Sequence, residues 1–108
     1  MEKPLKGDVV VIPFPFSDLS SSKRRPALVL ADLEGDDTIL CQITSIARQD
    51  RYAIALSNMD FLKGKLDFQS MIRPNKIFTA DKSIIIRKVG NIKEQKRKEV
   101  SEALSRLF

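Results

Sequence analysis

The stretch SSSKRRPALVLA, Ser20–Ala31, passes from three serines through three basic residues and Pro26 into an apolar run. The unbroken run Ala27–Leu30 is typical of a strand that is buried on both faces. Pro26 restricts the residue before it, Arg25, to an extended backbone conformation. The sequence therefore predicts one arginine fixed at the entry to a core strand, with the two cations before it on a mobile loop.

Further short strands are expected outward from this stretch, separated by turn residues. Pro13 and Pro74 should each end a strand, because proline cannot donate to a sheet ladder, and Gly90 should end the last one. The turn after Ala31 should place Gly35 at a positive φ. The predicted strands are residues 9–12, 27–30, 38–45, 53–56, 70–73 and 83–89, with residues 58–69 as an irregular connection and 75–83 as a loop.

A helix is expected to close the chain. Asn91 and Glu94 form a pair like a capping box at its start. Val100, Ala103, Leu104 and Leu107 follow at the i, i+3, i+4 and i+7 spacing of one apolar stripe. The prediction is a mainly β fold, a small and strongly curved antiparallel sheet or barrel with a C-terminal helix, in one domain over residues 1–108.

Composition limits the chemistry that is open to the chain. Its 19 basic and 14 acidic residues give a formal net charge of +5, which favours an anionic partner, nucleic acid above all. With no histidine and one cysteine, Cys41, it cannot build a Ser-His-Asp or Cys-His nucleophile, and a zinc site is not expected. The acidic turn Asp32–Asp37 lacks the spacing of a calcium loop, so neither metal nor cofactor is predicted. A reduced buried thiol, with no leader or membrane span expected, indicates the cytoplasm.

Four residues at three places in the sequence have side chains suited to phosphate chemistry. Arginine offers a rigid fork of donors that suits phosphate, and Arg25 would be held by its strand. Thr44 and Ser45 place two hydroxyls at the end of the third predicted strand, where they could contact phosphate or simply make a turn. Arg73 repeats the Arg-Pro joint. Together they would suit the stabilisation of a pentavalent phosphorus transition state.

The order and spacing of these motifs resemble the MazF/PemK toxins, the ribonuclease halves of bacterial type II toxin–antitoxin systems. KGDVVVIPFPFSD, Lys6–Asp18, followed by RRPALVLA, Arg24–Ala31, is similar to the opening of the family. CQITS, Cys41–Ser45, resembles its second motif, an apolar strand that ends in a hydroxyl pair. SMIRPNKIFTAD, Ser70–Asp81, resembles its third, a strand that delivers a basic residue.

The resemblance implies a compact SH3-like barrel of curved antiparallel sheet and a homodimer with RNA in a groove across it. It implies metal-independent, sequence-selective cleavage of single-stranded RNA, chiefly mRNA, through a 2′,3′-cyclic phosphate, and an acidic antitoxin as partner. Arg25 matches the arginine that acts as acid or transition-state stabiliser, Thr44 the threonine at the scissile phosphate, and Arg73 the arginine of the third motif. The residues expected to bind RNA are Lys23, Arg24, Ser45, Asn75 and Lys76.

Two features depart from the family pattern. Asn75 stands where some members carry a carboxylate that could act as the general base, and the loop before the Arg-Pro pair reads SDLSSSKR. Asp18 and Asp67 are alternative carboxylates. A second function therefore stays open, a catalytically weak or inactive RNA- or DNA-binding module of the same fold. A peptide-binding barrel is less favoured, because the chain has no Trp and one Tyr for an aromatic groove.

Overall fold

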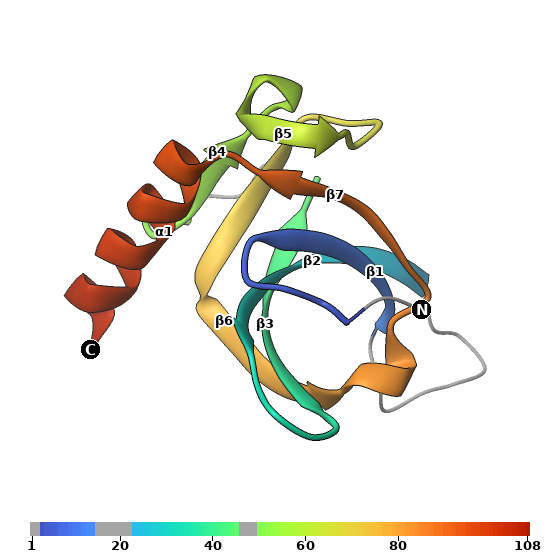
Figure 1. Ribbon diagram of the computed structural model, residues 1–108. Helices are drawn as coiled ribbons and strands as arrows, with labels where there is room; N and C mark the ends of the chain where they lie inside the picture. The colour runs from blue at the N-terminus through green and yellow to red at the C-terminus, as the bar shows by residue number, and fades with distance from the viewer. Residues whose placement is uncertain (1–2, 15–22, 46–49) are drawn as a thin grey trace.

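The computed structural model describes residues 3–14, 23–45 and 50–108, and within them seven strands form one antiparallel sheet (Figure 1). The strand order is β4-β6-β3-β2-β1-β7-β5. Helix α1 follows β7 in the chain and lies at the side of the curled sheet. The predicted mainly β fold with a curved antiparallel sheet and a C-terminal helix is confirmed. The elements are β1 Asp8–Phe14, β2 Lys23–Asp32, β3 Asp37–Thr44, β4 Ile54–Leu56, η1 Asn58–Asp60, β5 Phe61–Gly64, β6 Ser70–Asp81, η2 Lys82–Ile84, β7 Arg87–Ile92 and α1 Glu94–Leu107.

Both faces of the central strands are buried, as the apolar run of β2 predicts. Leu28 packs on one face with Val9, Cys41 and Ile43, a cluster that Val100 of α1 joins. Ala27 and Val29 pack on the other face against a second cluster, which contains Val10, Ile12, Leu40 and Ile85. Since the sheet curls, a single layer can enclose one cluster while the helix and the β4 and β5 ends of the sheet cover the other.

Strand β2 begins earlier than the sequence predicts. Lys23, Arg24 and Arg25 pair with residues 14, 13 and 12 of β1, so they lie in the sheet and not on a loop. Pro13 and Pro26 are both inside strands. Each is tolerated because pairing there is one-sided: β7 pairs with β1 only as far as Val11, and β3 pairs with β2 only from Ala27.

Strand β6 likewise continues through Pro74, where the sequence predicts its end. The register against β3 shifts between the pairs Cys41–Ile77 and Gln42–Arg73, so residues 74–76 form a bulge. The bulge releases Pro74 from the ladder, because extra residues in a bulge are left unpaired. Residues 75–83, expected to be a loop, belong largely to this strand and to η2.

The pairing of β5 with β7 is a further difference from the predictions. The connection 58–69 contains β5, and Gly90 lies inside β7, not at a break. A Cβ atom at Gly90 would collide with the carbonyl oxygen of Lys63, so this close pairing requires glycine. The predicted cap at Asn91 is wrong, because Asn91 lies in β7 and Lys93 is the residue before the helix; the Asn91 Oδ1 instead accepts a hydrogen bond from the Lys63 N–H at 3.2 Å.

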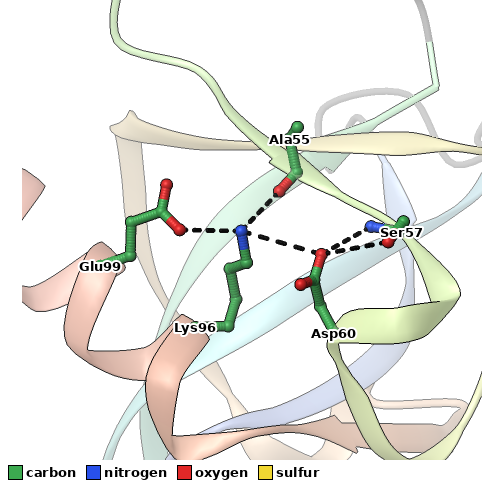
Figure 2. Close-up of polar contacts among 5 residues, drawn as sticks. All are labelled: Ala55, Ser57, Asp60, Lys96 and Glu99. Carbon is green, nitrogen blue, oxygen red and sulfur yellow. Dashed lines mark hydrogen bonds and ion pairs between the residues drawn. The ribbon is translucent and has the colours of Figure 1, made fainter.

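Helix α1 is attached to the sheet through Lys96 (Figure 2). The Lys96 Nζ donates to Glu99 Oε1 at 2.8 Å and to the carbonyl oxygen of Ala55 in β4 at 3.0 Å, and lies 3.7 Å from Asp60 Oδ2. The same Asp60 oxygen accepts from the Ser57 N–H at 2.9 Å. One largely buried ammonium thus joins the helix to β4 and η1. No helix in the described residues is long and apolar enough to cross a membrane.

We expect Lys96→Met to lower the free energy of unfolding by about 1–3 kcal/mol, because the Ala55 carbonyl and the Asp60 carboxylate both lose a charged partner. Methionine keeps most of the apolar stem. Chemical denaturation at neutral pH measures the effect. Lys98→Met, at an exposed position of the same helix, is the matched control. Equal stability of the two variants would contradict the structural role of Lys96.

Candidate nucleic-acid interface

A groove of about 690 Å³ runs along one end of the sheet. Its floor comes from Val11, Pro26 and Ile43 on three adjacent strands, and its walls come from the connection between β5 and β6 and from β7. The full lining is Val11, Lys23, Arg24, Arg25, Pro26, Ile43, Ser45, Gly64, Lys65, Leu66, Asp67, Phe68, Ser70, Arg87, Lys88 and Val89. A floor of packed strands fixes the relative positions of the walls, which are far apart in the sequence.

The groove is strongly basic. Six cations line it, against one carboxylate, that of Asp67, among the residues described. They are Lys23, Arg24, Arg25, Lys65, Arg87 and Lys88. The Lys88 Nζ lies 3.2 Å from Oδ1 of the buried Asp8, which offsets part of its charge. Low-dielectric walls concentrate a field of one sign, so this groove is suited to a polyanion.

The structure brings four of the predicted site residues to this groove. Lys23, Arg24 and Arg25 enter it from β2, and Ser45 follows β3 directly into it. Arg25 is half-buried, whereas Lys23 and Arg24 are exposed. Since Arg25 lies in a paired strand beside the buried Ala27, its position is fixed more tightly than that of a loop arginine.

The register separates the predicted residues onto two faces of the sheet. Ala27 pairs with Gln42, and directly opposite residues of antiparallel strands share a face. Arg25 comes two residues before Ala27 and Thr44 two residues after Gln42, so both lie on that same face. Arg24 and Ser45, one position away from them, share the other face with Pro26 and Ile43 in the floor of the groove. Arg25 thus lines the groove although it lies on the face of β2 opposite to the groove floor.

Thr44 is placed next to the groove but not in its lining. It is buried, 6% exposed, and pairs with Met71 of β6. Arg73 lies on the same face, because it pairs with Gln42. Diagonal neighbours in an antiparallel pair lie about 7–8 Å apart. The strand order β6-β3-β2 thus brings Arg25, Thr44 and Arg73 to one face of three adjacent strands.

The Arg73 guanidinium is already engaged. Its Nε lies 2.9 Å from Asp50 Oδ2, and its Nη1 donates to Gln42 Oε1 at 3.1 Å. The Asp50 Oδ1 also accepts from the Tyr52 N–H at 2.9 Å. This backbone hydrogen bond, together with Arg73, lowers the pKa of Asp50 although burial opposes the shift. The geometry indicates that Arg73 ties Asp50, and through it the backbone at Tyr52, to Gln42 of β3.

The remaining predicted residues lie elsewhere. Asn75 and Lys76 are exposed in the bulge of β6 and do not line the groove, and Asp18 lies outside the described residues. Burial raises the pKa of the Cys41 thiol to about 12, so this thiol stays protonated and unreactive. In the described part of the chain no three Asp, Glu or Cys residues gather as they would around a metal ion.

Sequence reasoning missed half of the cations in the groove. The sequence predicts an irregular connection at Lys65 and the interior of a strand at Arg87 and Lys88, and neither position indicates a groove. The available signal was the basic pair that directly follows the apolar run of residues 84–86, in the reverse of the order around Arg25, where the cations precede the apolar run. Phe68 was missed in the same way, since nothing local shows that the connection carrying it forms a wall of the groove.

Similar folds occur in solved endoribonucleases and toxins. The MazE-MazF complex (Form-III) from Deinococcus radiodurans superposes with a TM-score of 0.77 at 21% identity, over 98% of this chain and 96% of that one. An endoribonuclease from a Mycobacterial species gives 0.73 at 19% identity, over 98% and 91%. Another, in complex with its cognate antitoxin, gives 0.73 at 18%, over 98% and 93%. No curated protein matches the chain.

The family is identified by the sequence itself. The model of the PemK-like, MazF-like toxins of type II toxin–antitoxin systems matches residues 5–108, which include every strand of the sheet and the closing helix. The basic groove and the Arg-Pro entry to β2 lie inside the matched region. The chain therefore belongs to the family of PemK-like, MazF-like toxins of type II toxin–antitoxin systems.

Proposed function

We propose that this protein is a toxin that cleaves single-stranded RNA, chiefly mRNA, at short sequences and without a metal ion. The observation that carries the proposal is the position of Arg25, half-buried at the edge of a groove with five further cations around it. RNA binding to such a groove releases counterions from its phosphates. Family membership and the endoribonuclease neighbours support the reaction class. Because mRNA is its substrate in this proposal, the protein would act in the cytoplasm.

The proposed chemistry uses groups of the chain and of the RNA itself. The ribose 2′-oxygen attacks the adjacent phosphorus, the P–O5′ bond breaks, and a 2′,3′-cyclic phosphate and a 5′-hydroxyl result. Negative charge grows on the non-bridging oxygens in the transition state. Arg25 is the residue we assign to that charge, because a guanidinium can bind two phosphate oxygens at once. We place Thr44, on the same face, beside the same phosphate.

A base must accept the proton of the 2′-hydroxyl. The position that carries a carboxylate in some relatives is Asn75, whose amide cannot accept it at neutral pH. Asp67 is the one carboxylate among the described residues that line the groove. We propose Asp67 as this base, with solvent returning a proton to the leaving O5′.

Two protein partners belong to the proposal. Structural neighbours have been solved with MazE or with a cognate antitoxin. An acidic antitoxin that covers the groove would place carboxylates against six cations, which favours fast association and competes directly with RNA. The second partner is another copy of this chain, in the homodimer that the resemblance implies.

A second candidate is a binding module of the same fold with little catalysis, which Asn75 favours. The two functions differ in one measurement, cleavage of a long single-stranded RNA in the presence of EDTA. Products with 5′-hydroxyl and cyclic-phosphate ends support the enzyme. Salt-dependent binding with no cleavage at high enzyme concentration supports the module.

For Arg25, we expect Arg25→Ala to reduce the rate of RNA cleavage about 10²–10³-fold, the cost of losing one charged donor at a developing oxyanion. Arg25→Lys should recover part of that loss, because lysine keeps the charge without the planar fork. Single-turnover cleavage measures both. Arg106→Ala, in the last turn of α1 and outside the groove, is the control. Undiminished cleavage by Arg25→Ala would disprove the assignment.

Asp67→Asn should lower the single-turnover rate about 10²–10⁴-fold, the range for loss of a general base. RNA should bind at least as tightly as before, because one negative charge leaves the groove. The contrast between rate and affinity separates a base from a structural residue. Asp36→Asn, in the exposed turn between β2 and β3, is the matched control. A rate close to that of the wild type would remove Asp67 from the mechanism.

The Arg73–Asp50 pair gives a prediction for stability and pH. The pKa of Asp50 is below its ordinary value of 3.8 in the folded state, so its contribution is full above that pH and is lost as the pH falls through the folded value. Asp50→Asn should therefore cost about 1–3 kcal/mol of unfolding free energy at pH 7, and this cost should shrink progressively as the pH falls below 3.8. Glu102→Gln, exposed on α1, should show no such difference. A cost for Asp50→Asn that does not change with pH would refute the linkage.

A further inference from the structure

Phe68 stands out in the wall of the basic groove. Its side chain is 74% exposed, although phenylalanine is a large apolar residue that water disfavours. It lines the same groove as Lys65, Arg87 and Lys88. An exposed aromatic ring inside a cationic groove combines the two elements of single-strand binding surfaces, backbone-tracking charge and a stacking platform.

The backbone around Phe68 is held in place. The Ser70 Oγ donates to the carbonyl oxygen of Phe68 at 2.9 Å, and Ser70 is itself 4% exposed at the start of β6. On the other side, the Leu66 N–H donates to Asn58 Oδ1 at 3.0 Å, and the Leu66 side chain packs against the core. The ring is therefore presented from a fixed backbone, so little conformational entropy need be lost when a ligand stacks on it.

We propose that Phe68 stacks on a base of the bound single-stranded RNA, that of a nucleotide flanking the cleaved phosphate. The proposal rests on the proposed function, and it adds a binding residue to the same groove. Among the described residues that line the groove, cations outnumber carboxylates six to one, which favours a polyanion over a peptide. The ring supplies a contact that every base can make through its π-face, so Phe68 contributes affinity and not base identity.

The test uses a 2′-O-methyl oligoribonucleotide with the sequence around a cleavage site mapped for the wild type; blocking the 2′-oxygen prevents turnover. Phe68→Ala should weaken binding about five- to a hundred-fold, the range for one lost stacking contact. Phe108→Ala is the matched control, because Phe108 is 91% exposed but does not line the groove. Replacing each nucleotide in turn by an abasic one should reveal one position that matters in the wild type and not in Phe68→Ala.

Phe68→Trp gives an independent readout, because the chain contains no other tryptophan. It should bind at least as tightly as the wild type, and its emission should be quenched by the full oligonucleotide but not by the one abasic at the identified position. Wild-type affinity in Phe68→Ala, or equal abasic penalties in the two proteins, would overturn the proposal. So would a defect limited to binding an acidic antitoxin. If the wild type cleaves RNA while Phe68 proves dispensable, this inference alone fails; if the wild type neither cleaves nor binds RNA, the proposed function fails.

Discussion

The burial of β2 on both faces is the constraint on which the rest of the structure depends. Leu28 must be covered on one side and Ala27 and Val29 on the other, and a sheet with one helix can achieve this only by curling. Burial of one such apolar side chain contributes about 1.5–3 kcal/mol. Where β3 stops pairing with β2, at Ala27, the enclosed region ends. The residues before Pro26 are therefore the first in β2 that can carry charge, and three cations occupy positions 23–25.

The strands that can be predicted from the sequence are those whose own residue pattern indicates burial. The runs Val9–Ile12 and Ala27–Leu30 and the alternation in β3 indicate strands whatever their neighbours are. The errors occur where pairing depends on a distant partner. Pro13 and Pro26 can lie inside strands because one neighbouring strand is not paired at that point, and Pro74 can because it lies in a bulge of β6 itself. A local pattern cannot show on which side a strand is paired, so the sequence predicts strand ends at Pro13 and Pro74.

The same limit applies to the candidate site. The part that enters on β2 and β3, from Arg25 to Ser45, was recognisable because a family motif and a physical argument coincide there. The opposite wall was not, since Lys65 and Arg87 reach the groove only through the pairing of β5 with β7 beside β1. That pairing depends on Gly90, which read as a strand break because glycine is disfavoured in a regular strand. Gly90, where the sequence predicts the end of the last strand, is thus the residue that allows β5 and β7 to pair and form this wall of the groove.

The two arginines of the Arg-Pro joints lie in different electrostatic surroundings. Arg73 spends its guanidinium on Asp50 and Gln42, both within hydrogen-bonding distance. A guanidinium that is paired with a carboxylate attracts phosphate less strongly, because part of its charge is neutralised. Moving Arg73 away would also leave the buried charge of Asp50 without a partner. Arg25 instead stands in a groove where cations dominate, and close like charges repel unless an anion binds. Repulsion among the cations raises the free energy of the empty groove, and an anionic ligand relieves that repulsion. The same charges would therefore favour both the binding of RNA and the binding of an acidic inhibitor.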